Sequence, residues 1–303
     1  MLFTVLMSTY NGIKYIKEQL DSVFSQDAEH IEIRVIIRDD GSTDRTVAFC
    51  KEYAARNNVS ITIMEGDNIG PAASFLQLIQ HSEESDFYAF CDQDDVWLEG
   101  KVKAAVAALG IVSEPALWIS NYDVVDSELK MIEKSALEKP EDNQLNALFY
   151  NNVPGCTMVF NKALWYELKG LEVVHFRMHD ILTLCVALVF NNVLFDTKPY
   201  ILYRQHSLNA IGRYSKKIHL FSWIKEKTRY LISNETFNYS VYAKKIVNRY
   251  ADRLPDSLLK EYSLISEYRH ARNRIKLLTR PYTKNSLNRN TISMRLRILL
   301  GKV

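Results

Sequence analysis

The chain has 303 residues, of which 47% are hydrophobic and 24% are charged. This composition supports one large domain or two smaller ones and excludes a low-complexity chain. The net charge of +2 hides an asymmetry: residues 1–203 carry 16 Lys and Arg against 30 Asp and Glu, whereas residues 204–303 carry 22 against 6. An acidic front and a basic back indicate two parts with different partners.

The cysteines and the apolar segments point to the inside of a cell. No two of the four cysteines stand in a C-x-x-C spacing, so we expect reduced core residues. No targeting segment is evident at the apolar N-terminus, and the longest apolar run, 181–190, is too short to span a bilayer. We therefore expect a cytoplasmic protein, with a surface that touches the inner face of the membrane as an open alternative.

Short apolar runs alternate with helical patterns through the first part of the chain. Strands are predicted at 2–7, 32–38, 59–65 and 86–91, with helices between them over 13–24, 43–57 and 71–82. Asn11 is the predicted N-cap of the first helix. Strands alternating with crossover helices predict an α/β fold with a mostly parallel sheet, in which ligands bind beyond the carboxyl ends of the strands.

The pattern changes twice further along the chain. Strands at 116–121, 156–160 and 193–203, the last interrupted by Pro199, and a helix at 176–191 predict a mixed extension of the sheet. Basic, Tyr-rich helices are predicted at 218–232, 235–252, 256–279 and 288–300. We therefore divide the chain into a catalytic domain, 1–210, and a helical C-terminal region, 211–303. Within the catalytic domain, 1–112 is the expected nucleotide part and 113–210 the acceptor part.

The cluster Asp92-Gln93-Asp94-Asp95 directly follows the fourth strand. Three carboxylates in four residues repel one another unless a cation compensates. Mg²⁺ and Mn²⁺ bind one or two carboxylates together with substrate phosphates. The position after a buried strand favours a metal and diphosphate site over a solvated acidic loop.

Other polar clusters follow the other parallel strands. Residues 8–12, Ser-Thr-Tyr-Asn-Gly, suit a nucleobase that is stacked and hydrogen-bonded, or form only a capped turn. Asp40 suits a base or ribose, or serves the dipole of the next helix. The glycines of 66–70 form a tight turn. No dinucleotide fingerprint and no phosphate loop of ATP-hydrolysing enzymes is present.

Two further groups come from the second part of the domain. Asp180, after His179, is either a helix cap or a general base for an acceptor hydroxyl. Arg204 and His206 suit a leaving diphosphate, and His206 also suits the metal shell.

These motifs, in this order, resemble family 2 inverting glycosyltransferases of the GT-A fold. The resemblance covers roughly residues 1–210 and rests on Ser8-Thr9-Tyr10-Asn11, Asp39-Asp40-Gly41-Ser42, Asn68-Ile69-Gly70, Asp92-Gln93-Asp94-Asp95 and His179-Asp180. D-Q-D-D-V-W, G-C-T-M-V-F-N at 155–161 and Y-R-Q-H at 203–206 are similar to the bacterial rhamnosyltransferase branch. His179 stands where the family usually has Glu. The Arg usual after the N-x-G turn is absent, so Arg204 and His206 would supply the positive charge.

The resemblance implies roles for individual residues. Asp180 would be the catalytic base, and Asp94 the main metal ligand with Asp92 and His206. The nucleotide-sugar site would comprise Ser8, Thr9, Tyr10, Asn11, Asp40, Asn68, Asp92, Gln93 and Arg204. The acceptor side would comprise Asp95, Trp97, Gly155, Cys156 and His179.

The expected reaction is a metal-dependent inverting transfer with Mn²⁺ or Mg²⁺. The resemblance implies a nucleotide-diphosphate sugar donor, dTDP-β-L-rhamnose in the rhamnosyltransferase branch, and a glycan or lipid-linked glycan acceptor. A UDP-sugar donor, a nucleotidyltransferase and a non-catalytic nucleotide-binding scaffold are the alternatives. The basic helices suit an anionic membrane surface, packing on the catalytic domain or a homodimer. We expect no nucleic-acid partner.

Overall fold

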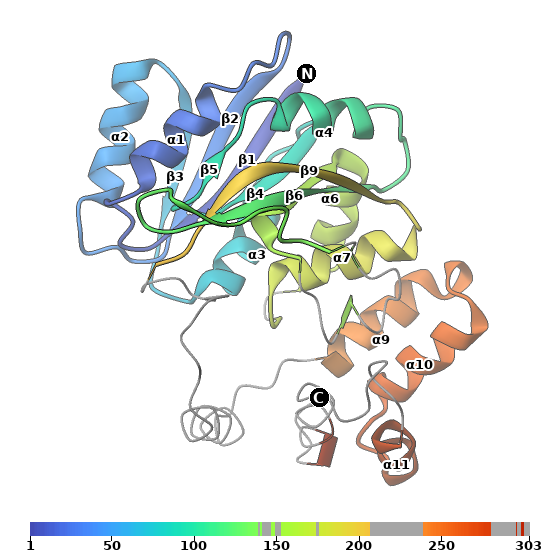
Figure 1. The fold of residues 1–303 in the computed structure, drawn as a ribbon. Helices are drawn as coiled ribbons and strands as arrows, with labels where there is room; N and C mark the ends of the chain where they lie inside the picture. The colour runs from blue at the N-terminus through green and yellow to red at the C-terminus, as the bar shows by residue number, and fades with distance from the viewer. Residues whose placement is uncertain are drawn as a thin grey trace.

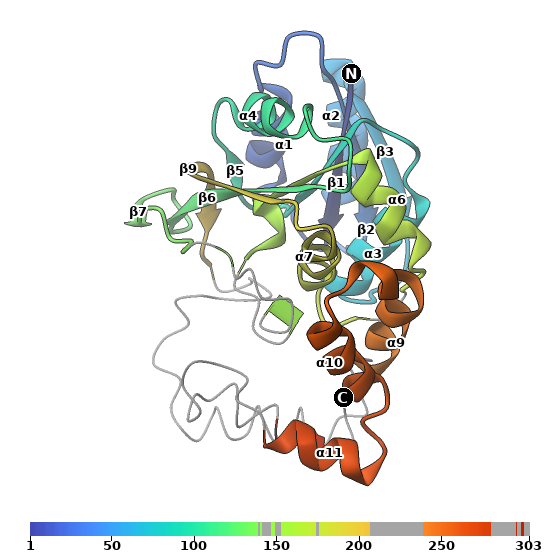
Figure 2. The ribbon, with the colours of Figure 1, turned by 90° about the vertical axis from the view of Figure 1, so that its right-hand side faces the viewer.

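The fold is described here from a computed structural model, which describes residues 1–138, 140, 147–148, 153–173, 176–206, 239–279, 295 and 298–299 (Figure 1). In this part of the chain, nine strands form one sheet of order β3-β2-β1-β4-β8-β6-β9-β5, and β7 pairs with β6. Helices lie on both faces of the sheet (Figure 2). The α/β fold with a mostly parallel first half is therefore confirmed.

The first four strands form the parallel half of the sheet. They are β1 (Leu2–Thr9), β2 (Glu32–Asp39), β3 (Ser60–Glu65) and β4 (Phe87–Cys91). β1 lies in the centre, paired in parallel with β2 and β4, and its buried apolar side chains belong to the core. Because these strands run the same way, the segments that follow β1, β2 and β4 meet at one edge of the sheet.

The second half of the sheet is mixed. It contains β5 (Val96–Trp97), β6 (Leu117–Val125), β7 (Met131–Glu133), β8 (Met158–Asn161) and β9 (Val193–Arg204). β8 runs antiparallel to both β4 and β6, and so joins the two halves. β9 runs parallel to β6, with a register irregularity where Pro199 lies opposite Asn121. The predicted strand therefore continues through Pro199, because the irregularity accommodates a residue without an N–H.

Among the described residues up to 206, six helices cover the sheet. They are α1 (Ile16–Phe24), α2 (Thr46–Asn57), α3 (Pro71–His81), α4 (Lys101–Leu109), α6 (Lys162–Gly170) and α7 (His179–Val189). α3, α6 and α7 contact one another on one face, and α1 and α4 lie on the other (Figure 2). A short 3₁₀ turn, η1 (Gly155–Thr157), leads into β8. The sequence reading did not predict α4 or α6.

Two local predictions are wrong. Asn11 does not cap α1, which begins at Ile16 after Tyr15. Asn11 has a φ of 48°, and its side-chain oxygen accepts hydrogen bonds from the backbone N–H groups of Thr43 and Asp44, ahead of α2. The helix predicted over 256–279 is two helices, because the chain turns between residues 266 and 271.

The described part of the C-terminal region forms α9 (Tyr239–Tyr250), α10 (Asp256–Ser266) and α11 (Ala271–Leu278). The helix predicted at 218–232 and most of that at 288–300 lie outside the described residues. Among the described residues, none of the helices is both long enough and apolar enough to cross a membrane. All four cysteines are buried and free of disulfides, as predicted for core residues.

α9 packs on the end of α6 and the residues after it, and two of its three basic side chains bond there. The Lys245 ammonium donates to the carbonyl oxygens of Leu171 and Glu172, just after α6. Arg249 forms an ion pair of 2.8 Å with Glu167. Much of the basic charge of α9 is therefore used within the protein.

Candidate active site

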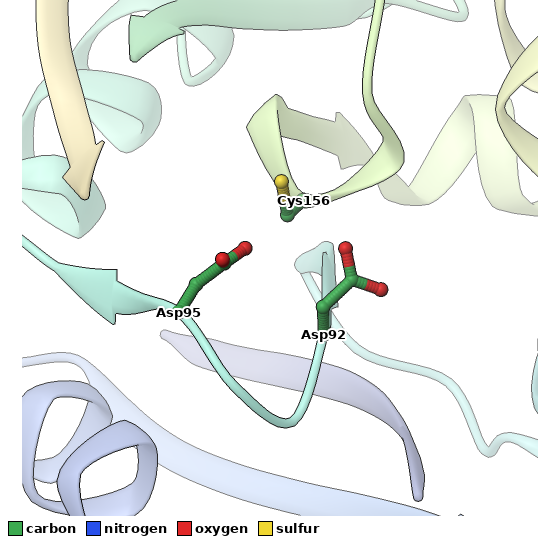
Figure 3. Close-up of side chains that lie close together, drawn as sticks. All are labelled: Asp92, Asp95 and Cys156. Carbon is green, nitrogen blue, oxygen red and sulfur yellow. The ribbon is translucent and has the colours of Figure 1, made fainter. Parts of the chain in front are cut away.

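The loop 92–95, between β4 and β5, lies at the edge where β1, β2 and β4 end. The carboxylate oxygens of Asp92 and Asp95 and the thiol of Cys156 lie within 4.8 Å of one another (Figure 3). Cys156 belongs to η1, so the turn before β8 closes over the acidic loop. The predicted acidic site and the predicted acceptor segment therefore meet.

Burial and mutual repulsion dominate the electrostatics of this loop. Burial, followed by the charges of Asp94 and Asp180, raises the pKa of Asp92 to about 7. Burial, followed by Asp94 and Asp92, raises the pKa of Asp95 well above its usual range. Asp95 is 1% exposed, and one of its carboxylate oxygens has no hydrogen-bond partner among the described residues. A nearby cation stabilises the ionised form of such a cluster.

Asp94 and His206 are joined by a hydrogen bond of 2.8 Å between Asp94 Oδ2 and His206 Nε2. The His206 ring lies against Tyr15 at 4.8 Å between ring centroids, tilted by 31°. Carboxylate and imidazole are both ligand types of divalent ions, and Asp94 lies in the same loop as Asp92 and Asp95. The donor set therefore fits the metal that the sequence predicts.

Arg204 is a structural centre of the site. Its guanidinium is 2% exposed, donates to the carbonyl oxygens of Asp94 and Ser127 at 2.7 Å each, and pairs with Glu18 of α1. Its backbone N–H donates to Asp95 at 2.9 Å. Arg204 therefore connects β9 to α1 and to the acidic loop. Its contact with a diphosphate stays a prediction.

The segment after β1 lies beside the acidic loop. Tyr10 and Gln93 exchange two hydrogen bonds, from Tyr10 N to Gln93 Oε1 at 2.9 Å and from Gln93 Nε2 to Tyr10 O at 3.0 Å. The Tyr10 side chain is 47% exposed, which leaves its ring available for stacking. Ser8 bonds to Ser74 of α3, and Thr9 donates to Asp39 at 2.8 Å.

Asp40 is buried and bound on both carboxylate oxygens. It pairs with Arg38 of β2, and it accepts the backbone N–H groups of Ile69 and Gly70 at 2.8 Å each. These bonds hold the turn 66–70 against the end of β2, while Asn68 is exposed on that turn. Asp40 therefore shapes this end of the site, and a contact with a base stays a prediction.

α7 begins beside the acidic loop with His179 and Asp180. His179 is 3% exposed and stacks on Phe75 at 3.9 Å between ring centroids, and burial lowers its pKa to about 3. A Cβ on Gly155 would lie 2.3 Å from His179 Nε2, so only glycine fits there without movement. The Asp180 carboxylate accepts the N–H of Ile181 at 2.6 Å.

The structure brings together Asp92, Asp94, Asp95, His206, Cys156, His179 and Asp180. Trp97 is 3% exposed and lies in β5, directly after the loop. Three residues that contact the site were not predicted from the sequence: Arg38, Tyr15 and Lys101. Lys101 is buried and its ammonium lies 3.8 Å from the centre of the Trp97 ring. Only its spacing after the acidic cluster, at the start of an apolar helix, could have drawn attention to it.

Comparisons with known proteins agree with this architecture. A family model described as glycosyl transferase family 2 matches residues 4–167. The dTDP-rhamnosyl transferase RfbG of Shigella flexneri is 31% identical over 258 residues, which cover 81% of this chain and 85% of RfbG. The putative glycosyltransferase EpsH of Bacillus subtilis is 27% identical over 232 residues, 71% of this chain and 64% of EpsH.

Solved structures show the same fold. S. aureus TarS 1–349 in complex with UDP-GlcNAc aligns with a TM-score of 0.60 at 20% identity, over 92% of this chain and 76% of that chain. The mannosyltransferase PcManGT from Pyrobaculum calidifontis, in complex with GDP-Man and Mn²⁺, aligns with a TM-score of 0.51 at 16% identity, over 99% and 85%. The chain belongs to glycosyl transferase family 2 and is a glycosyltransferase built on the GT-A fold.

Proposed function

We propose that this glycosyltransferase moves L-rhamnose from dTDP-β-L-rhamnose to a glycan acceptor, with inversion at the anomeric carbon. The observation that carries the proposal is that η1 links the acidic loop to the start of α7. Cys156 lies within 4.8 Å of Asp92 and Asp95. Gly155 lies against His179, the neighbour of Asp180. The similarity to RfbG supports rhamnose and dTDP. A UDP-sugar donor is the alternative, which the TarS complex with UDP-GlcNAc supports.

The proposed reaction is a single in-line displacement. The acceptor hydroxyl oxygen forms the new bond to the anomeric carbon, while the bond from that carbon to the diphosphate oxygen breaks. The proton of the hydroxyl passes to the Asp180 carboxylate as the new bond forms. Tyr10 and Asp92 bind the nucleoside, and Arg204 acts indirectly, by fixing the positions of Asp94 and Asp95.

The proposed metal ligands are Asp94 and His206, with Asp92 close by. A bound Mn²⁺ or Mg²⁺ supplies positive charge for the negative charge that builds on the leaving diphosphate. The Tyr15 ring packs against the His206 ring, and the imidazole bonds to Asp94.

We propose that the acceptor is lipid-linked and that the enzyme works at the inner face of the cell membrane. α11 supports this proposal, because it exposes Arg272 and Lys276 together with Ile275, whose side chain is 63% exposed. Cationic and apolar side chains on one helix suit an anionic lipid surface. Failure of the purified protein to bind anionic liposomes at low salt would remove this part of the proposal.

A donor panel tests the function directly. Purified protein is incubated with dTDP-rhamnose, UDP-GlcNAc, UDP-glucose and GDP-mannose, each with Mn²⁺ and with EDTA, and nucleoside diphosphate release and thermal protection are measured. We expect dTDP-rhamnose with Mn²⁺ to give the largest response. A preference for a UDP-sugar would favour the alternative donor, and no response to any nucleotide sugar would contradict the proposal.

The variant Asp94→Ala tests the metal site in the same assay. We expect it to lose the gain in donor affinity that Mn²⁺ gives to the wild-type protein, since a main ligand is missing. Asp27→Ala removes an exposed carboxylate from a loop outside the site and serves as the control. An unchanged Mn²⁺ effect in Asp94→Ala would show that the metal is held elsewhere.

A further inference from the structure

Lys101 is a buried cation whose role neither the resemblance nor the proposed reaction explains. It is the first residue of α4, directly after the acidic loop and β5, and its exposed fraction is 0%. Its ammonium donates to the carbonyl oxygen of Cys156 at 2.7 Å and lies over the Trp97 ring. It therefore reaches the same turn whose thiol lies beside the carboxylates of Asp92 and Asp95.

Two features make Lys101 costly for the fold. Removing an ammonium from water carries a large desolvation penalty, which a methionine of similar length would avoid. A positive charge at the first residue of a helix also opposes the helix dipole. Lys103, two residues later on α4, is exposed and shows that the helix can carry a lysine in water instead.

The Lys101 ammonium lies close to the acidic cluster without being tied to one carboxylate. Its hydrogen bond to the Cys156 carbonyl oxygen and its position over the Trp97 ring both suit a charged ammonium. Burial lowers its pKa to about 8, and the neighbouring Cys156, Cys91, Asp95 and Asp92 counteract that shift. Within the described residues, no ion pair of 4.0 Å or less joins it to a carboxylate. The buried guanidinium groups of Arg38 and Arg204, in contrast, are paired with Asp40 and Glu18. The positive charge of Lys101 therefore acts on the cluster as a whole.

We infer that Lys101 is the fixed counter-charge of the acidic cluster, which weakens binding of the divalent cation and strengthens binding of the nucleoside diphosphate. The inference rests on the proposed function, since it assigns both ligands to this cluster. Lys101 acts as a positioning and charge-balancing residue beneath Asp92 and Asp95. The Lys101 ammonium reduces the repulsion between the carboxylates and an incoming diphosphate. The divalent cation then neutralises the negative charge that Lys101 leaves uncompensated.

The counter-charge role predicts opposite changes in two affinities. Without the ammonium, Mn²⁺ is attracted to a carboxylate cluster with less fixed positive charge beside it, so its affinity rises. A nucleoside diphosphate meets the same uncompensated negative charge, so its affinity falls. A unit charge at this range in a partly buried site is expected to change each dissociation constant on the order of tenfold. A lysine that only holds the fold together would, when removed, weaken both ligands.

The test measures Mn²⁺ binding and dTDP binding separately, without following turnover. Mn²⁺ binding to the nucleotide-free protein is followed by electron paramagnetic resonance of the free ion, and dTDP binding in EDTA is followed by calorimetry. For Lys101→Met we expect tighter Mn²⁺ binding and weaker dTDP binding. Lys101→Arg keeps the charge and should shift neither by much, and Lys103→Met on the exposed face of α4 is the matched control.

Two further variants address folding. Lys101→Gln loses the charge but keeps an amide that can donate to the Cys156 carbonyl oxygen. Lys101→Met combined with Asp95→Asn removes one charge of each sign, and we expect its Mn²⁺ affinity to return toward the wild-type value. If every uncharged variant unfolds, including this balanced pair, Lys101 serves the fold alone and the inference is wrong.

The wild-type measurements separate the inference from the proposed function. If the wild-type protein binds neither Mn²⁺ nor dTDP, the proposed function fails first. If it binds both, and Lys101→Met shifts the two affinities in the same direction or leaves both unchanged, only the role of Lys101 is refuted.

Discussion

Asp180 and His179 are neighbours in the chain with different surroundings. Asp180 lies in the first turn of α7, within electrostatic range of Asp92, whereas His179 points into a cage formed by Phe75 and Phe90. The aromatic residue thus anchors the start of α7, and the carboxylate next to it is held toward the acidic cluster. This arrangement explains how a histidine can precede the proposed base without itself carrying charge.

Replacing Asp180 by Asn should separate binding from transfer. The amide keeps the size of the side chain but cannot take the proton of the acceptor hydroxyl, so we expect transfer to fall roughly 10²–10⁴-fold. Donor affinity, measured by calorimetry with Mn²⁺, should stay close to the wild-type value. Asp256→Asn makes the same change at an exposed carboxylate in the first turn of α10 and should leave both unchanged. Near wild-type turnover in Asp180→Asn would exclude it as the base.

The buried imidazole of His179 predicts a pH dependence of stability. Its folded-state pKa of about 3 lies below the ordinary value of 6.5, so the unfolded chain binds more protons between these two pH values. Its contribution to the free energy of unfolding therefore rises as the pH rises from 3 to 6.5, by about 1 kcal/mol per pH unit.

The variant His179→Phe keeps the ring stack and removes this titration. Urea unfolding of both proteins at several values between pH 4.5 and 7.5 gives the difference in stability at each pH. Asp92, whose raised pKa of about 7 produces the opposite slope between roughly pH 4 and 7, is present in both proteins and cancels in that difference. A difference that does not change with pH would show that folding leaves the pKa of His179 at its ordinary value.

At the scale of elements, the site depends on η1 fitting closely against α7. Gly155 lies where its missing side chain leaves space for His179 Nε2. His179 cannot retreat freely, because Phe75 and Phe90 enclose its ring. η1 and the start of α7 therefore hold each other in position over the acidic loop.

Gly155→Ala should disturb this contact. The new Cβ would lie 2.3 Å from His179 Nε2, so we expect a loss of about 1–3 kcal/mol in the free energy of unfolding, together with reduced transfer. Chemical unfolding and an activity assay measure the two effects. The double variant with His179→Ala relieves the clash and should be more stable than the sum of the two single changes predicts. Strict additivity would argue that the two residues do not meet.

The sequence predicts the elements of the donor half well, because each strand and helix there has a clear apolar period and a polar cluster at its end. It misses α4, which belongs to the donor half, and α6, which follows β8 in the mixed half. The wrong N-cap at Asn11 has a physical reason. An Asn before a helix can satisfy the N–H groups of another turn brought close by the fold, here those of Thr43 and Asp44.

Some charged residues of the site could be predicted from the sequence, and others could not. The carboxylates of 92–95 and Asp180 stand out because polar residues at strand and helix ends predict a ligand. Arg38 and Lys101 have buried charges whose partners are supplied by the tertiary fold: Lys101 donates to the carbonyl oxygen of Cys156, 55 residues away in the chain. No local pattern distinguishes such residues from surface charges.

At the scale of the whole molecule, α9 joins the C-terminal region to the acceptor side. Tyr242 packs on Phe176, at 5.1 Å between ring centroids, just ahead of α7. The Lys245 ammonium reaches the carbonyl oxygens of Leu171 and Glu172, which follow α6. The C-terminal helices are therefore connected to the two helices that support the proposed base.

Lys245→Met should weaken this connection. Two carbonyl oxygens lose a charged donor, so we expect the free energy of unfolding to fall by about 1–3 kcal/mol, seen as a lower Tm in calorimetry. Lys244→Met removes the adjacent exposed lysine and is the matched control, with Tm close to the wild-type value. Equal effects of the two changes would mean that the contact of Lys245 adds nothing to stability.

Strands from the second part of the chain pair with strands from the first part. This strand order determines whether the nucleotide part can fold as a separate fragment. β4 ends the parallel half, but its free side is covered by β8, and the two-residue strand β5 pairs with β9. A fragment ending near residue 112 would leave β4 as an uncovered edge of apolar residues and would lack Arg204 to hold the acidic loop. Such an edge invites pairing with other copies. Swapping nucleotide halves between relatives to change the donor should therefore give aggregating chimaeras, unless β8 and β9 are exchanged with them.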